Sequence, residues 1–212
     1  DDISVLPAVA LDSAGVYTDN TLFSIGPFAS DDNVGYAYPF LETSETTDND
    51  NSLGFSGNMF DLTAAKDLVV YGFDINPRLR DNIQQVKVYY RADTYVGHGT
   101  SNAGWLLVDS LDFYAQPTGK LSHVELTQPI TVPAGATYGI YVCISTGPNY
   151  TTSTGSNGSF SNDDLQFNGG YGGMYFNSTS ARIWSGRIYY KVAEEHKEMQ
   201  VMQTDTNGTT SV

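Results

Sequence analysis

Runs of alternating apolar and polar residues most constrain the fold of this 212-residue chain. In residues 83–91, Val86 and Val88 share one face of an extended strand, and the residues between them take the other. The same period of two recurs at residues 137–145 and 182–192. Such alternation predicts strands with one face turned toward a core.

Turn signals separate these runs, and the composition suits strands rather than helices. The chain has 15 Tyr and 21 Gly residues, and Lys, Glu, Leu and Ala are sparse. Strands that recur about every 10 to 15 residues, with turns between them, predict an all-β fold: an antiparallel, jelly-roll-like β-sandwich. The segments rich in Gly, Pro, Asn and Asp are 76–82, 97–104, 116–120, 132–136 and 145–164.

Three regions follow from these patterns. Residues 1–44 are predicted to be an acidic N-terminal extension, residues 45–192 the β-sandwich domain, and residues 193–212 a polar C-terminal tail. The extension contains two apolar pieces, 3–11 and 21–28, that need a partner to cover them. The extension is therefore expected to serve assembly.

Charge narrows the range of partners. Ten Lys and Arg stand against 24 Asp and Glu, and the net charge is −14. Such a chain repels phosphate backbones and anionic lipids, so we expect neither a nucleic-acid partner nor membrane insertion. Apolar runs such as 138–144 are far shorter than the roughly 20 residues that a membrane-spanning helix needs. Because the sequence starts at Asp1, we interpret it as a mature, secreted protein trimmed of its targeting segment.

Acidic loops offer a candidate calcium site. Oxygen ligands from Asp48, Asp50 and Asn51, and from Asp163 and Asp164, fall in segments that read as loops. Ca²⁺ prefers such hard oxygen ligands. The alternative for the first group is a solvated linker in front of the sandwich.

Aromatic residues offer a candidate ligand site. Tyr171 and Tyr175 lie in a glycine-rich loop, and alternation turns Tyr89 and Tyr189 away from the core, so these four rings could stack on sugars. Their neighbours Tyr90, Tyr190 and Trp184 are assigned to the core by the same alternation.

Catalytic signals are weak, and we expect no enzyme. The nucleophile elbow, the zinc-protease helix and the phosphate-binding loop are all missing from the sequence. The histidines, at positions 98, 123 and 196, are far apart. Cys143 sits in an apolar run and reads as a buried core thiol.

Residues 56–76 carry the clearest pair of strands. Residues 63–67 are predicted to form the turn between them. Asn58, Asp61 and Asp74 are expected to fix strand ends, because short polar side chains bond to nearby backbone groups.

The order of several motifs resembles a β-sandwich module that recurs in secreted, multidomain bacterial surface proteins. The motifs are GNMFD, VYY, YVG, PAG and the closing WSGRIYY, and the resemblance covers residues 53–192. It implies an extracellular, non-catalytic module of adhesive, cell-surface or matrix proteins. Residues 1–44 and the tail lie outside it.

Two hypotheses about function remain open from sequence. The first is a structural or cell-surface protein that docks to copies of itself or to other surface proteins through its extensions. The second is an extracellular carbohydrate-binding or adhesion module that binds glycans, with loops stabilised by Ca²⁺. A hydrolase that uses paired carboxylates is a third and weaker possibility.

Overall fold

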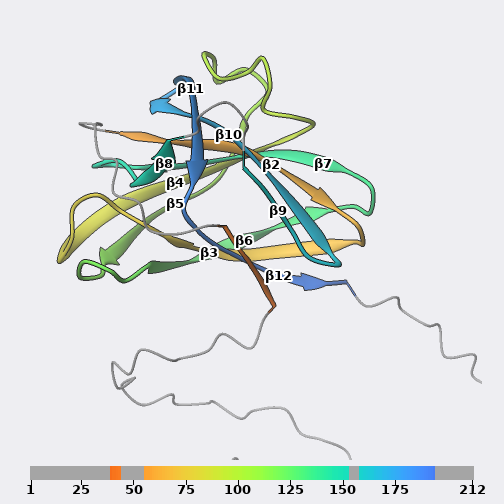
Figure 1. The fold of residues 1–212 in the computed structure, drawn as a ribbon, viewed down its shortest axis with the longest axis horizontal. Helices are drawn as coiled ribbons and strands as arrows, with labels where there is room; N and C mark the ends of the chain where they lie inside the picture. The colour runs from red at the N-terminus through yellow and green to blue at the C-terminus, as the bar shows by residue number, and fades with distance from the viewer. Residues whose placement is uncertain (1–38, 44–54, 153–157, 194–212) are drawn as a thin grey trace, which may run out of the picture. The chain divides into compact units, whose positions relative to one another are not determined.

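The computed structural model describes residues 39–43, 55–152 and 158–193 of the chain, which belong to one unit, Tyr38–Val212. Two antiparallel sheets pack against one another in this unit, and all the secondary structure in the described ranges is strand (Figure 1). The predicted β-sandwich is therefore confirmed. The jelly-roll connectivity stays a prediction.

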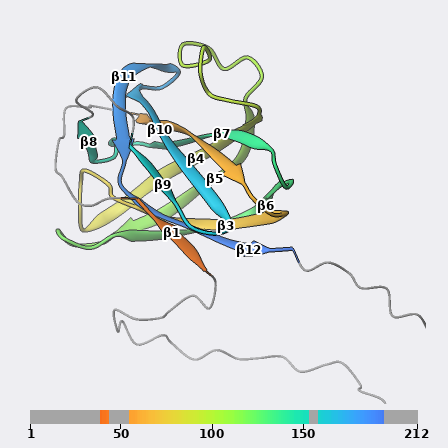
Figure 2. The same ribbon diagram turned by 45° about the vertical axis from the view of Figure 1, so that its right-hand side comes forward.

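The smaller sheet has four strands in the order β1-β12-β3-β6. Figures 1 and 2 show β1 at its outer edge, beside β12. The order is far from the sequence order, because the last strand described lies inside the sheet. Its strands are β1 (Phe40–Glu42), β12 (Gly186–Val192), β3 (Leu68–Ile75) and β6 (Ser122–Val132).

The larger sheet has eight strands in the order β5-β4-β7-β2-β10-β11-β8, with β9 paired to β10. The strands are β5 (Leu106–Ala115), β4 (Asn82–Ala92), β7 (Thr137–Ile144), β2 (Ser56–Ala64), β10 (Leu165–Met174), β11 (Asn177–Trp184), β8 (Tyr150–Thr152) and β9 (Ser159–Ser161).

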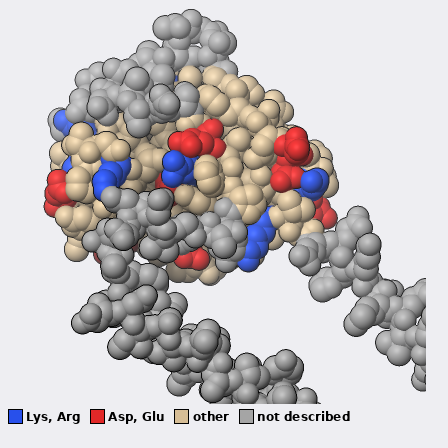
Figure 3. All heavy atoms as spheres, turned by 60° about the horizontal axis from the view of Figure 1, so that its bottom comes forward, with Lys and Arg blue, Asp and Glu red and all other residues tan. Residues whose placement is uncertain are grey.

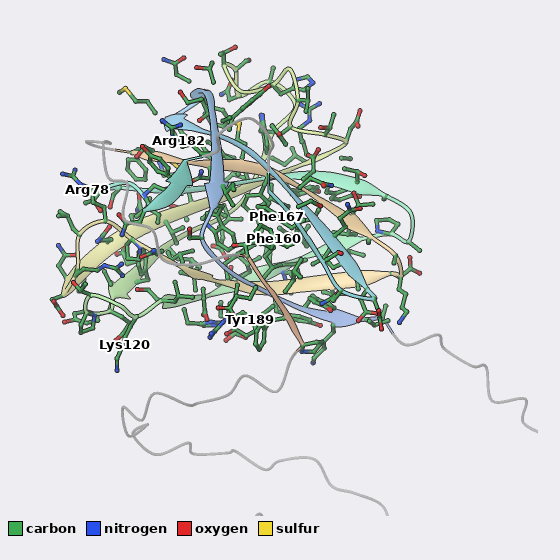
Figure 4. The ribbon with its side chains drawn as sticks, in the orientation of Figure 1. Arg78, Lys120, Phe160, Phe167, Arg182 and Tyr189 are labelled. Carbon is green, nitrogen blue, oxygen red and sulfur yellow. The ribbon has the colours of Figure 1, made fainter. Side chains whose placement is uncertain are left out.

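The main core fills the space between the two sheets. Trp184 lies at its centre, stacked on Phe60 with ring centroids 5.1 Å apart and edge-on to Phe73 at 5.9 Å. Figure 4 shows Phe160 and Phe167 in the same layer, with ring centroids 5.9 Å apart. Burying these large rings supplies much of the apolar area removed from water on folding.

A close approach of two backbones marks the larger sheet. The register of β10 against β2 shifts between Asn168 and Tyr171. A Cβ atom at Gly170 would lie 1.9 Å from the Met59 carbonyl oxygen, so only glycine fits at this position.

The strand predictions agree with the structure in most places. The turn 63–67 joins β2 to β3, and the three runs of alternation become β4, β7 and the end of β11 with β12. The predicted loop 145–164 also contains two three-residue strands, β8 and β9.

The boundary predicted at residue 44 needs correction. Strand β1 falls inside the predicted extension, yet Leu41 is buried in the main core. Residues 40–42 therefore belong to the sandwich. Residues 1–38 and 44 of the predicted extension lie outside the described residues, and so does the tail after Ala193.

Charge is unevenly divided along the chain. The described residues hold nine of the ten Lys and Arg but only 11 of the 24 Asp and Glu. On the face drawn in Figure 3, acidic and basic side chains are interspersed among uncharged ones. The described part of the sandwich is thus nearly neutral, and most of the net charge of −14 lies elsewhere in the chain. In the described residues, no helix is long and apolar enough to cross a membrane.

Candidate functional site

Strand β1 joins the N-terminal part of the chain to the sandwich. It pairs with β12 through the register Phe40 with Tyr189, Leu41 with Ile188 and Glu42 with Arg187. Its side chains alternate, so Leu41 enters the main core while its two neighbours face outward. A three-residue strand is thereby anchored by both backbone pairing and apolar burial.

Thr43 closes the end of this strand. Its buried hydroxyl donates to the Trp184 carbonyl at 2.7 Å and accepts from the Gly186 amide at 3.1 Å. Its own amide donates to the Gly186 carbonyl at 3.0 Å. The chain passes from β11 in the larger sheet to β12 in the smaller sheet at this point, so Thr43 satisfies backbone groups where the ladders are interrupted.

A polar cluster covers the outer face of the smaller sheet beside β1. The buried carboxylate of Asp74 accepts a hydrogen bond from the Tyr189 hydroxyl at 2.7 Å and lies 2.8 Å from His123 Nδ1. Arg187 Nη1 lies 3.5 Å from Asp74, and Arg187 Nε lies 3.4 Å from Glu42. Arg187 therefore links the β1 strand to the carboxylate at the centre of the cluster.

The side chains of this polar cluster come from four strands, and their contacts join these strands to one another. Burial raises the pKa of Tyr189 to about 12, and the hydrogen bond to Asp74 adds to the shift. A phenol with such a pKa remains a hydrogen-bond donor at neutral pH. These contacts can keep β1, β12, β3 and β6 in register, which is a structural role and not a catalytic one.

Tyr189 was predicted to offer an outward ring to a sugar, and this needs correction. The residue does lie on the outer face of the smaller sheet (Figure 4), but it is only 6% exposed. The Phe40 ring lies 5.6 Å from it and the His123 ring 5.1 Å. Phe40 on β1 and His123 on β6 therefore cover the ring that alternation alone predicts to be exposed.

A second apolar group, which we call the outer aromatic cluster, lies on the face of the larger sheet away from the main core. The loop before β5 and the turn between β10 and β11 contribute to it. Half-buried Phe55, Tyr171 and Phe176 pack against it. Its buried members are Met59, Tyr89, Tyr95, Trp105, Tyr141 and Cys143.

Three of the predicted ligand-binding residues meet at this cluster. The Tyr89 and Tyr175 hydroxyls are hydrogen-bonded to each other, and the Tyr171 ring lies edge-on to Tyr95 at 5.2 Å. Tyr89 faces outward as predicted, but it is only 8% exposed. The ring of Phe176 packs against it at 5.2 Å, so Tyr89 supports the cluster instead of presenting a free face.

The exposed rim of the cluster is the part that could contact a ligand. Tyr175 is 41% exposed. Lys87 Nζ lies 4.6 Å from the centre of the Phe55 ring and 5.5 Å from that of Tyr175. An ammonium group between two aromatic faces orders the rim through cation–π attraction.

Part of the predicted calcium site lies in the described residues. Asp48, Asp50 and Asn51 lie outside them. Asp164 is bound to Lys66 Nζ at 2.6 Å, and this lysine lowers the pKa of the Asp164 carboxyl. Within residues 39–43, 55–152 and 158–193, no group of three or more His, Cys, Asp or Glu side chains is placed to hold a metal.

Asp61 and Asn58 were predicted to fix strand ends, but both lie inside β2. Asp61 lies within β2 and accepts from the Thr94 hydroxyl at 2.7 Å and the Tyr95 amide at 2.9 Å, so it fixes a loop after β4 and not a strand end. Burial raises the pKa of its carboxyl. Asn58 also lies within β2, buried, with both side-chain polar atoms unpartnered among the described residues.

Cys143 is fully buried, as predicted. Burial raises the pKa of its thiol to about 12. A thiol in this state is a poor nucleophile at neutral pH.

Sequence reasoning missed Thr43, Arg187 and Lys87. For Lys87 a signal existed, because alternation places it on the same face as Tyr89. For Thr43 and Arg187 the sequence held no such signal, because Thr43 is 141 residues away from Trp184 and Arg187 is 145 residues away from Glu42.

Models of known protein families give no match to the chain, and none of the curated proteins matches it.

Proposed function

We propose that the chain is a secreted, non-catalytic structural or cell-surface protein that assembles with copies of itself or with other surface proteins through its extensions. The observation that carries this proposal is β1. The segment after the acidic N-terminal extension is built into the sheet edge, with Leu41 in the core and Thr43 bonded to Trp184. Because β1 fixes the extension to the sandwich, a neighbouring unit that binds the extension is held to the sandwich as well.

The edge strands of the sandwich favour assembly through the extensions and disfavour direct pairing between the edge strands of two copies. Strand β6 ends the smaller sheet, and four of its residues, 126–129, lie between the register pairs Val70 with Ile130 and Gly72 with Glu125. Pro129 lies in this bulge. Bulges, prolines and short edge strands all hinder sheet-to-sheet association. Contact between units would then have to come from added segments.

The division of charge also supports this function. A nearly neutral sandwich can approach its copies without strong repulsion, whereas the acidic segments keep the chain soluble. The resemblance to modules of bacterial surface proteins agrees with an extracellular location.

Light scattering and negative-stain microscopy of the full chain test the proposal. We expect species much larger than the 23.0 kDa monomer. A chain without residues 1–20 keeps β1 and should give the same circular dichroism spectrum but remain monomeric. A full chain that stays monomeric at every concentration would show that it does not assemble with copies of itself.

A second candidate function is glycan binding by the rim of the outer aromatic cluster. The observation that favours it is the exposed Tyr175 beside Lys87 and Phe55. Glycan-array binding that is lost in Tyr175→Ala, but kept in the exposed control Tyr114→Ala, would support it. A clean negative array would count against it.

A further inference from the structure

Lys87 extends from β4 into the rim of the outer aromatic cluster, where its charge meets only aromatic rings. Its Nζ lies 4.6 Å from the centre of the Phe55 ring and 5.5 Å from that of Tyr175. Among the described residues no carboxylate forms an ion pair with it, whereas Lys66 is bound to Asp164 at 2.6 Å. The side chain is half-buried, but its ammonium is not closed off from solvent. Its three N–H donors therefore remain open to a ligand.

Two tyrosine hydroxyls lie at the same rim. The Tyr89 and Tyr175 hydroxyls are hydrogen-bonded to each other, and this bond uses only one of their two protons. Burial raises the pKa of Tyr89, so its phenol stays protonated at neutral pH. Together with the ammonium, the pair presents hydrogen-bond donors. A matching ligand is rich in acceptors and carries a negative charge.

The Tyr175 ring gives the rim an exposed aromatic face, and its position is fixed by a strained turn. The next residue, Phe176, has a φ of 48°, which bulky side chains rarely adopt. The Phe176 ring packs against those of Tyr89 and Tyr141, each with centroids 5.2 Å away. The Tyr175 amide also donates to the Phe55 carbonyl at 3.1 Å. Backbone strain of this kind clusters at ligand-binding sites.

The backbone beneath the rim is closed to an added strand. Strand β4 is paired with β5 and β7, and β10 is paired with β2 and β11. An extended peptide that adds to a sheet needs a free edge, so a ligand at this rim is held by side chains alone. One ammonium, one exposed ring and one hydroxyl pair match a compact ligand the size of a sugar ring better than an extended peptide.

We propose that the rim formed by Lys87, Tyr89 and Tyr175 binds a sugar that bears a carboxylate. The inference rests on the second candidate function, glycan binding, and names the class of glycan; it is independent of assembly. The carboxylate accepts charge-assisted hydrogen bonds from the Lys87 ammonium. The sugar ring packs on the Tyr175 face, and a sugar oxygen accepts the remaining proton of the tyrosine pair.

Calorimetric titration of the full chain tests this proposal with matched sugars. The acidic probes are trigalacturonic acid and sialyllactose. Their neutral partners are the methyl ester of trigalacturonic acid and lactose, which keep the sugar rings but lack the charge. We expect both acids to bind, and each neutral partner to bind at least about tenfold more weakly.

Variants assign the site. Lys87→Gln should weaken the binding of the acids about tenfold but not that of the neutral sugars, and Lys87→Arg should keep most of the affinity. Tyr175→Ala should weaken both kinds of sugar. The control Lys66→Gln removes a lysine that is already paired with a carboxylate, and it should bind as the unmodified chain does. Asp112→Asn removes a carboxylate from the same face of β5, and it should bind no more weakly than the unmodified chain. Equal affinity of Lys87→Gln and the unmodified chain would overturn the assignment.

Chemical acetylation of the unmodified chain gives a measurement that needs no substitution. Trigalacturonic acid should slow the acetylation of Lys87 and leave that of Lys66 unchanged. Equal rates at Lys87 with and without the sugar would contradict the proposal.

The outcomes separate this inference from the function on which it rests. Equal affinity for the acids and their neutral partners would overturn the acidic class and leave glycan binding standing. Binding of neither acid would overturn the inference, and a clean negative glycan array would remove glycan binding as well. A peptide of residues 1–13, which is acidic but not a sugar, should not bind; if it binds at Lys87 and the acids do not, the rim belongs to an acidic protein segment.

Discussion

The Thr43 hydroxyl donates a hydrogen bond of 2.7 Å to the backbone carbonyl of Trp184, 141 residues away in the sequence. The bond joins the first described strand to the point where the chain crosses from the larger sheet to the smaller one. One side chain thus holds the N-terminal segment and the crossing together.

Replacing this hydroxyl should weaken the whole sandwich. Thr43→Val keeps the shape but leaves the Trp184 carbonyl and the Gly186 amide without their partner, and each such buried loss costs about 1–3 kcal/mol. Urea unfolding should show a lower free energy of unfolding for Thr43→Val, with Thr43→Ser close to the unmodified chain. Equal stability of Thr43→Val and Thr43→Ser would mean that the hydroxyl contributes nothing.

Stability should fall at alkaline pH. Burial raises the pKa of Tyr95 and of Tyr189 from 10.0 to about 12. Below about pH 10 both phenols are protonated in the folded and unfolded states, so they add no pH dependence. Above it the unfolded chain ionises first, and the free energy of unfolding falls as pH rises toward about 12.

Thermal melts at a series of pH values would measure this fall, and tyrosinate absorbance would report the ionisation. Tyr189→Phe should flatten the alkaline part of the curve. The same substitution at exposed Tyr114 is the control. A melting temperature that is level through this range in the unmodified chain would contradict the expectation.

The Cys143 thiol should be unreactive in the native protein. Burial and a pKa of about 12 keep it protonated and shielded. Ellman's reagent at neutral pH should detect no thiol in the folded chain and one per chain in guanidinium chloride. Prompt labelling of the folded chain would show that the outer aromatic cluster opens readily.

Gly170→Ala should be strongly destabilising. The new methyl group would collide with the Met59 carbonyl, which belongs to the backbone and cannot turn aside. We expect a loss of at least about 2 kcal/mol, as for other strained core substitutions. Chemical unfolding measures it, and Ile83→Ala on the surface of β4 is the control that should change little.

The sequence predicted the features that depend on local order. Alternation identified β4, β7 and β12, and it placed Tyr190 and Trp184 in the core, where both are buried. Tyr90 was assigned there as well and is half-buried against it. Period-two patterning is a local signal, so it needs no knowledge of which strands are neighbours.

Burial on the outer faces could not be predicted in the same way. Alternation turned Tyr89 outward correctly, but the residue that covers it, Phe176, arrives from a turn 87 positions later. The β1 strand was assigned to the extension because three residues are too few to show a period. Its pairing with β12 exists only in the folded chain.

The place of β12 has a consequence for how the protein is made. This strand follows every other described strand in the sequence, yet it lies between β1 and β3. As the chain leaves the ribosome, β1 and β3 therefore remain without their common neighbour β12, which is synthesised about 110 residues after β3. The smaller sheet can close only after β12 has been synthesised, so its pairing depends on contacts between segments far apart in the sequence, and such contacts form slowly.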